Sequence, residues 1–233
     1  MKTTYQASDG AAYEVFLGRW TRVLAGPFAE FARLPEEGAI IDVGCGTGSL
    51  SLTLAERRSG RVAGIDIAAP YIAFARSRPV GDRADFAVGD ACGLPCADRC
   101  FDAAVAQLAL NFVPDPALAL REMRRVVRPG GVLAAAVWDF RGGLVYQRLF
   151  WDTAAGLDPD AGATRDRLFS SPLALPDGLP AAMARKPVSA RSSAGRSQSG
   201  WNTQILPIIG NRCSAAKVRS ALMLWGCRRS GVG

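Results

Sequence analysis

The chain has 233 residues, 49% of them hydrophobic, and a formal net charge of +7. This size predicts one domain with a substantial core, and it excludes a small disulfide-stabilised scaffold despite the six cysteines. The first ten residues lack the pattern of a signal peptide, and no stretch approaches the roughly 18 apolar residues of a membrane helix, so we expect a cytoplasmic protein without a membrane partner.

The positive charge is confined to the C-terminal tail. Residues 1–185 hold 20 basic and all 21 acidic residues, whereas residues 186–233 hold eight basic residues and no acidic ones. The neutral body argues against a nucleic-acid partner. The tail is rich in Ser, Arg and Gly and lacks clean periodicity, which fits either a disordered basic arm or a stretch produced by a shifted reading frame. Bulky residues such as Trp201, Ile208 and Trp225 favour the second interpretation. We therefore expect one domain over 1–185 and an atypical tail over 186–233.

Helical and strand patterns alternate along the body. Residues 11–33 predict two helices broken near Gly26-Pro27, and 128–131 (RPGG) predict a turn. Asp115 is the expected N-cap of a helix, and residues 158–180 are expected to be loop and lid material. The other expected elements are strands at 39–43, 61–66, 84–90, 101–110 and 132–140, and helices at 49–58, 69–78, 115–127 and 144–156.

This alternation predicts an α/β fold with a doubly wound, mostly parallel sheet covered by helices on both faces, with its core at about 38–140. In such sheets a ligand binds at the carboxyl ends of the strands, where the strand order reverses. The stretch 40–55, IIDVGCGTGSLSLTLA, ends its strand at that edge and places Gly44, Gly46 and Gly48 there.

The spacing of these glycines helps to identify the ligand. A dinucleotide fingerprint, G-x-G-x-x-G, requires glycine where this chain has Ser49 or Ser51. Asp42, just before the loop, is poorly placed for a pyrophosphate and well placed for an ammonium group. The pattern therefore favours a nucleoside with a cationic arm.

Two more acids follow the next two predicted strands. Asp66 can accept hydrogen bonds from both hydroxyls of a ribose. Asp90 can accept from an exocyclic adenine amine, and the N–H of Ala91 can donate to a ring nitrogen. With Asp42, these residues predict a site for an adenosine that bears an amino-acid arm.

Four stretches resemble the class I S-adenosylmethionine-dependent methyltransferases, and the resemblance covers about residues 10–157. They are IIDVGCGTGSLSLTLA, VAGIDIAAPYIAFAR, FAVGDACGLPCADRCFDAAVAQLAL and ALREMRRVVRPGGVLAAAVWD. The resemblance is closest to the small-molecule, quinone-biosynthesis-like (type 11) group. It implies a Rossmann-like fold, S-adenosyl-L-methionine as cofactor, and methyl transfer to a small-molecule acceptor by in-line displacement.

The resemblance also implies roles for single residues. The three glycines would surround the methionine part, Asp66 would hold the ribose, and Ile67 would pack on the adenine. Asp90 and Ala91 would contact the adenine edge, and Gln107 and Leu108 would line the cofactor. The segment YEVFLGRW resembles the family's N-terminal lid, in which Tyr13, Arg19 and Trp20 would close over the cofactor carboxylate.

The family fold ends in a helix and an antiparallel strand pair, and neither strand is recognisable in residues 186–233. We therefore expect this pair to be missing or degraded, which would leave the last core strand with an exposed edge that favours self-association. Neither the oligomeric state nor the identity of the methyl acceptor follows from these motifs.

Each site assignment also has a structural alternative. The glycines fit a tight turn, Asp66 a helix cap and Asp90 a turn cap. Gln107 fits a structural polar residue, and Tyr13 and Trp20 fit an amphipathic helix face. Two further functions stay open: a protein that binds S-adenosylmethionine without catalysis, and an NAD(P)-binding oxidoreductase, which the glycine spacing and Asp42 disfavour.

Cys92, Cys96 and Cys100 form a C-x3-C-x3-C pattern, for which an iron–sulfur cluster is one interpretation. The chain has no histidine to complete a ligand set, so we expect these cysteines to fill apolar space and expect no metal site. Without histidine, an oxygen acceptor would lose its proton to Asp, Glu, Tyr or water, and we assign no catalytic residue.

Overall fold

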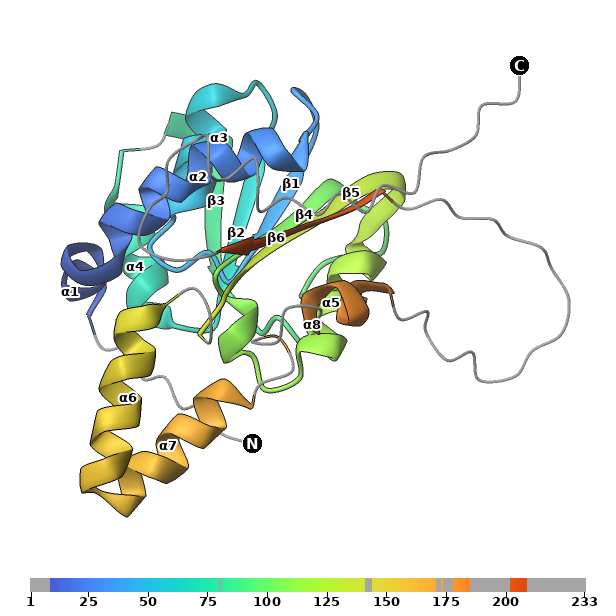
Figure 1. The fold of residues 1–233 in the computed structure, drawn as a ribbon. Coiled ribbons are helices and arrows are strands. Elements are labelled where there is room, and N and C mark those ends of the chain that lie inside the picture. Colours follow the sequence, from blue (N-terminus) through green and yellow to red (C-terminus); the bar gives the residue numbers. More distant parts are fainter. Residues whose placement is uncertain are drawn as a thin grey trace, which may run out of the picture.

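A six-stranded parallel sheet forms the centre of the protein (Figure 1). The computed structural model describes residues 9–79, 81–140, 144–170, 173, 178–184 and 202–208. The strands are β1 Ile40–Val43, β2 Val62–Asp66, β3 Ala84–Val88, β4 Phe101–Gln107, β5 Val127–Trp138 and β6 Asn202–Ile208, in the order β3-β2-β1-β4-β5-β6. Every neighbouring pair is parallel, and the order reverses between β1 and β4. The predicted doubly wound fold is confirmed.

Helices cover both faces of this sheet (Figure 1). They are α1 Gly10–Tyr13, the π-helical turn η1 Glu14–Gly18, α2 Arg19–Ala32, α3 Ser49–Arg57, α4 Ala69–Ser77, α5 Pro116–Val126, α6 Val145–Leu157, α7 Pro159–Phe169 and α8 Gly178–Ala184. Short 3-10 turns lie at Gly81–Arg83 and Leu110–Phe112. Side chains of α2 and α3 join one buried cluster, and those of α5 and α8 join the other.

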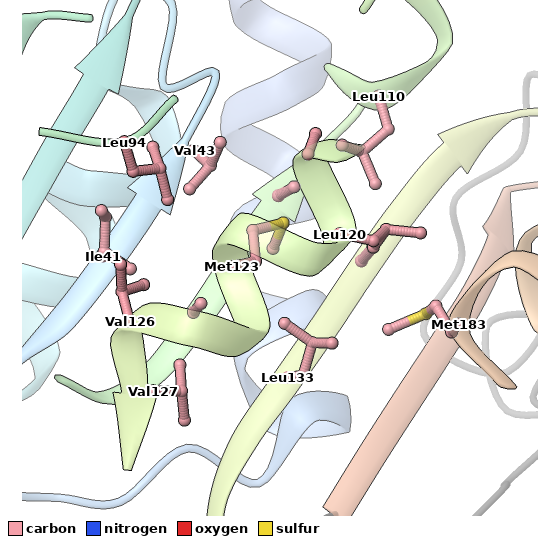
Figure 2. Close-up of a cluster of buried hydrophobic side chains, with 14 of the residues drawn as sticks. Ile41, Val43, Leu94, Leu110, Leu120, Met123, Val126, Val127, Leu133 and Met183 are labelled. Carbon is pink, nitrogen blue, oxygen red and sulfur yellow. The ribbon is translucent and has the colours of Figure 1, made fainter. Parts of the chain in front are cut away.

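Alternate strand residues supply the two clusters, as the two-residue period of a strand requires. Ile41 and Val43 pack on the side of α5, whereas Ile40 packs on the side of α2 and α3. Figure 2 shows Met123 and Val126 of α5 among side chains from β1 and β5. The sheet is therefore buried on both faces, and only the strand ends can form a polar site.

The N-terminal helices differ from the expectation. The predicted break at Gly26-Pro27 is wrong, because α2 continues through both residues. A Cβ at Gly26 would lie 2.9 Å from the Arg57 guanidinium, so glycine at this position allows the close approach of α3. The irregularity lies instead at Glu14–Gly18, where the backbone forms the π-helical turn.

Two predicted irregular segments belong to regular elements. The expected turn at 128–131 lies within β5, where the register to β4 jumps from Phe101 beside Val127 to Ala103 beside Val132. Four residues bulge opposite one, and Gly130 adopts a φ of +81° there. The expected loop at 158–180 contains α7 and the start of α8, so that prediction is wrong for Pro159–Phe169 and for 178–180. The N-cap prediction for Asp115 is confirmed, since its carboxylate accepts from the N–H of Leu118 at 2.9 Å.

The expected exposed edge of β5 is covered. Strand β6 runs parallel to it, from Asn202 beside Val132 to Ile208 beside Trp138. No antiparallel pair closes the sheet within the residues that the structure describes. The tail therefore contributes one strand that the sequence patterns did not predict, and the rest of the tail prediction lies outside the described residues.

Over the described part of the chain, no helix combines the length and the apolar character needed to cross a bilayer.

Core packing gives a first test. Met123 is fully buried in the cluster of Figure 2, so we predict that Met123→Ala lowers the free energy of unfolding by about 2–5 kcal/mol. Arg121 is exposed on the same helix, and Arg121→Ala should change the free energy of unfolding by less than about 0.5 kcal/mol. Urea unfolding followed by circular dichroism measures both values, and equal losses would contradict the assignment of the buried face of α5.

Candidate functional site

The carboxyl ends of β1, β2 and β4 open onto a cavity of about 470 Å³. This volume lies in the range of small-molecule sites, which is about 300–1,000 Å³. The cavity adjoins the point where the strand order reverses, as expected for this type of sheet. Nine residues that the sequence predicted line it: Tyr13, Gly44, Gly46, Asp66, Ile67, Asp90, Ala91, Gln107 and Leu108.

The three loop glycines all have positive φ but different surroundings. A Cβ at Gly44 would lie 2.2 Å from the Cβ of Ala109, and one at Gly48 would lie 3.0 Å from the Phe86 ring. Packing therefore requires glycine at 44, whereas at 48 a Cβ would need a small shift of the Phe86 ring and would be strained by the positive φ. A Cβ at Gly46 would meet no atom within 4 Å, and its backbone faces the cavity. Gly46 is thus the position at which a ligand could approach the bare backbone.

Asp66 connects the glycine loop to the end of β2. Its Oδ2 accepts from the N–H of Gly46 at 2.8 Å, and its Oδ1 accepts from the N–H of Ala68 at 2.8 Å. Burial raises the pKa of Asp66, and the two backbone hydrogen bonds oppose that rise. Each oxygen has further acceptor capacity, so the carboxylate can orient the loop and still bind hydroxyl groups in the cavity.

The adenine-side candidates lie along the rim. Asp90 is exposed, and its Oδ1 accepts from the N–H of Cys92 at 2.8 Å, which is the turn-capping role considered above. Asp90 and Ala91 nevertheless both line the cavity. Ile67 is 63% exposed there and presents an apolar surface that a flat ligand could cover.

Asp42 lies deeper, at 1% exposure, beside a second cavity of about 20 Å³. Its Oδ2 accepts from the hydroxyl of Ser51 at 2.6 Å, whereas its Oδ1 has no hydrogen-bond partner among the described residues. Burial raises the pKa of Asp42 to about 7, partly opposed by the Ser51 hydrogen bond. Half of this carboxylate is therefore available to a ligand.

Gln107 lines both cavities and presents a second free acceptor. Its Nε2 donates to the carbonyl of Thr21 at 2.9 Å, which holds α2 against the end of β4. Its Oε1 is buried without a hydrogen-bond partner within the described ranges. The small cavity has room for one water-sized group, and its two free oxygens, on Asp42 and Gln107, both suit a donor.

The N-terminal segment, residues 10–18, contributes only part of the predicted lid. Tyr13 and Leu17 line the larger cavity, and the Tyr13 and Tyr71 ring centroids lie 5.0 Å apart. Trp20 is 52% exposed, with the Arg19 guanidinium 5.1 Å from the centre of its ring. Among the described residues around the two cavities, Arg19, Trp20 and Gly48 do not appear.

Sequence reasoning missed the polar partners on α3. Ser49, Ser51 and Thr53 are all buried, and they alternate with leucines in SLSLTLA. Buried hydroxyls in the first turns of a helix after a glycine loop were a usable signal, because such groups need partners. Ser51 supplies that partner to Asp42.

The apolar end of the larger cavity was also missed. Phe112, Val113, Pro114 and Trp138 line it. Asn111 fixes these elements together: its Oδ1 accepts from the N–H of Trp138 at 2.8 Å, and its Nδ2 donates to the same residue's carbonyl at 3.2 Å. This wall offers aromatic and aliphatic surface to a bound molecule.

The cysteine pattern does not form a metal centre in the described part of the chain, where no group of three His, Cys, Asp or Glu side chains could hold an ion. Cys92 and Cys96 pack against the cluster around α5. The Sγ of Cys100 lies 3.0 Å from the carbonyl of Ala97.

Comparison with known proteins agrees with this architecture. The family model described as a methyltransferase domain matches residues 41–135. A demethylmenaquinone methyltransferase of Roseiflexus castenholzii is 35% identical over 138 residues, which cover 54% of this chain and 58% of that protein. A 27-O-demethylrifamycin SV methyltransferase of Amycolatopsis mediterranei is 32% identical over 166 residues, which cover 70% of this chain and 56% of that protein.

The chain thus spans somewhat more than half the length of these two relatives. A solved structure from Methanococcus maripaludis, provisionally described as an S-adenosyl-L-methionine-dependent methyltransferase, gives a TM-score of 0.50 at 20% identity. The matched region covers 73% of this chain and 81% of the other chain. At 20% identity the match supports the fold alone. Residues 41–135 thus match a methyltransferase domain, and the strand order of the sheet agrees with the expected resemblance to the class I S-adenosylmethionine-dependent methyltransferases.

Proposed function

We propose that this protein transfers a methyl group from S-adenosyl-L-methionine to a small-molecule acceptor. One observation carries the proposal: Asp42 and Gln107 line a small cavity beside the bare backbone of Gly46, and each has a buried acceptor oxygen without a hydrogen-bond partner among the described residues. Acceptors in a buried space attract an ammonium group and repel a phosphate. An NAD(P)-type ligand would bring its pyrophosphate to this loop, so the donor set favours the methionine arm.

The remaining residues fit the other parts of the cofactor. Asp66 would accept from the ribose hydroxyls with the acceptor capacity that Gly46 and Ala68 leave. Ile67 would cover the adenine face, and Asp90 with the Ala91 N–H would bind its edge. Gly44 and Gly48 support the loop through packing, and Leu108 and Tyr13 complete the walls.

When bound, the cofactor supplies an electrophilic methyl group on a sulfonium ion. The protein's contribution is to hold an acceptor in line with that methyl group and to exclude water. The wall of Phe112 and Trp138 suits this role, since it lies in the same cavity as the cofactor residues. The two relatives are named for methylation of demethylmenaquinone and 27-O-demethylrifamycin SV, which are small molecules, and this supports the same class of acceptor here.

Calorimetric titration tests the proposal directly. We expect S-adenosylhomocysteine to bind to the full-length chain, and NAD to bind much more weakly or not at all. Tighter binding of NAD would overturn the proposal in favour of an oxidoreductase. Binding of S-adenosylhomocysteine without methyl transfer to any of a panel of phenols, quinols, amines and acids would instead indicate a non-catalytic binding protein.

We predict that Asp66→Ala weakens the binding of S-adenosylhomocysteine by about 10- to 100-fold, because it removes charge-assisted hydrogen bonds to the ribose. Asp85 is an exposed acid on β3, next to β2, so Asp85→Ala is a matched control that should bind normally. A thermal melt without ligand shows whether either variant is folded. Normal affinity in a folded Asp66→Ala protein would contradict the ribose assignment.

Asp42 gives a prediction about pH. Its raised pKa of about 7 means that the ligand-free carboxyl is protonated at acidic pH, whereas an ammonium group favours its ionised form. Affinity for S-adenosylhomocysteine should therefore fall as the pH drops from about 7.5 to 5.5, and binding should release protons in that range. Titrations in buffers with different ionisation enthalpies measure this release.

The matched variant for this prediction is Asp42→Asn, which keeps the shape and an acceptor for Ser51 but cannot titrate. It should bind more weakly than the parent at pH 7.5 and show a flat pH profile. A pH-independent affinity in the parent protein would mean that Asp42 does not respond to the ligand.

A further inference from the structure

Glu14 lies inside the contact between the N-terminal segment and the glycine loop. Its side chain is only 14% exposed. The hydroxyl of Thr47 donates to its Oε1 at 2.5 Å, and the guanidinium of Arg22 donates to its Oε2 at 2.6 Å. Both carboxylate oxygens are therefore engaged, one of them by the glycine loop itself.

Arg78 closes this contact from the end of α4. Its Nη1 donates to the carbonyl of Thr47 at 3.2 Å and lies 3.7 Å from Oε1 of Glu14. Thr47 is 1% exposed, so its hydrogen bonds are largely shielded from water. Charge-assisted bonds in such surroundings are stronger than those on an open surface.

The backbone of the segment is shaped for the Glu14 carboxylate. Glu14 begins the π-helical turn that ends at Gly18, and such turns are frequent at functional sites. A Cβ at Gly18 would lie 2.5 Å from Cδ of Glu14. Gly18 has a φ of −56°, which any residue can adopt, so a Cβ there would conflict only with the Glu14 carboxylate, which would have to move.

This contact joins two walls of the larger cavity. Tyr13 and Leu17, on either side of Glu14 in the sequence, line the cavity from the N-terminal segment. Thr47 follows Gly46, whose open backbone faces the same cavity from the loop. Breaking the contact between Glu14 and Thr47 would therefore remove one of the links that hold the two walls together.

We propose that Glu14 is a positioning residue, which holds the N-terminal segment closed against the glycine loop and so sets the rate at which a bound nucleoside escapes. The structural part of this inference concerns the chain alone. The part about ligand escape rests on the proposed function.

The first test is a stopped-flow measurement of S-adenosylhomocysteine dissociation. We expect Glu14→Gln and Thr47→Val each to accelerate dissociation about tenfold. The double variant should be no faster than the faster single variant, because both changes break one contact. Glu30, an exposed glutamate on α2, provides the control, and Glu30→Gln should dissociate like the parent. Additive effects, or equal acceleration by Glu30→Gln, would overturn the proposal.

A third variant separates positioning from simple loss of helix stability. Gly18→Ala raises the intrinsic helix propensity of the segment but places a methyl group where the Glu14 carboxylate lies. We expect dissociation to accelerate in this variant as well. A rate equal to or below that of the parent would show that the carboxylate contact does not control escape.

Hydrogen exchange of the ligand-free protein completes the test. Amides of residues 10–18 should exchange faster in Glu14→Gln than in the parent, while those of α5 should not change. If S-adenosylhomocysteine fails to bind even to the parent, the proposed function fails, and this measurement still decides the positioning role. Unchanged exchange across residues 10–18 would refute that role whether or not the ligand binds.

Discussion

The buried carboxylate of Asp42 is the constraint on which the site depends. Asp42 lies in β1 among three buried apolar residues, Ile40, Ile41 and Val43. Among the described residues its carboxylate accepts one side-chain hydrogen bond, from Ser51. A buried carboxylate with an unpartnered oxygen lowers the stability of the ligand-free fold. The same desolvation raises the pKa of Asp42. Such a group is understandable where a bound cation restores the missing interaction, since functional sites are where proteins accept local instability.

The parallel sheet explains why the polar residues of the site lie at the carboxyl ends of the strands. Both faces of the strands are buried by helices, so a polar ligand can reach the chain only at the strand ends. Near the reversal between β1 and β4, Asp66 and Gln107 line the larger cavity, and Asp42 and Gln107 line the smaller one. The carboxylates therefore come together because of topology, although they lie far apart in the sequence.

The sequence was sufficient for those parts of the fold that depend on local patterns. The runs that became β1 to β4 are short and largely apolar, with glycine directly after β1 and β3 and Asp66 as the last residue of β2, so these strand positions and the acids near their ends could be predicted. The break at Pro27 and the 128–131 bulge were misjudged because tertiary contacts decided them: burial of α2 in the core on both sides of Pro27 in one case, and pairing with β4 in the other. Strand β6 was missed for a similar reason, since the edge of β5 supplies its hydrogen-bond partners.

The polar side chains of the site also divide into those that a local sequence pattern predicts and those whose partners depend on tertiary contacts. Asp66 could be assigned from its place after a strand, but the bond from Gln107 to Thr21 spans 86 residues and the bond from Thr47 to Glu14 spans 33. No local pattern indicates which helix face will meet which loop. The first of these bonds holds α2 and the second holds residues 10–18, whereas the glycine loop is continuous with β1 and α3. A cavity that must admit a ligand and then exclude water needs one wall that can move, and a wall attached by side chains opens at lower cost than one continuous with the sheet.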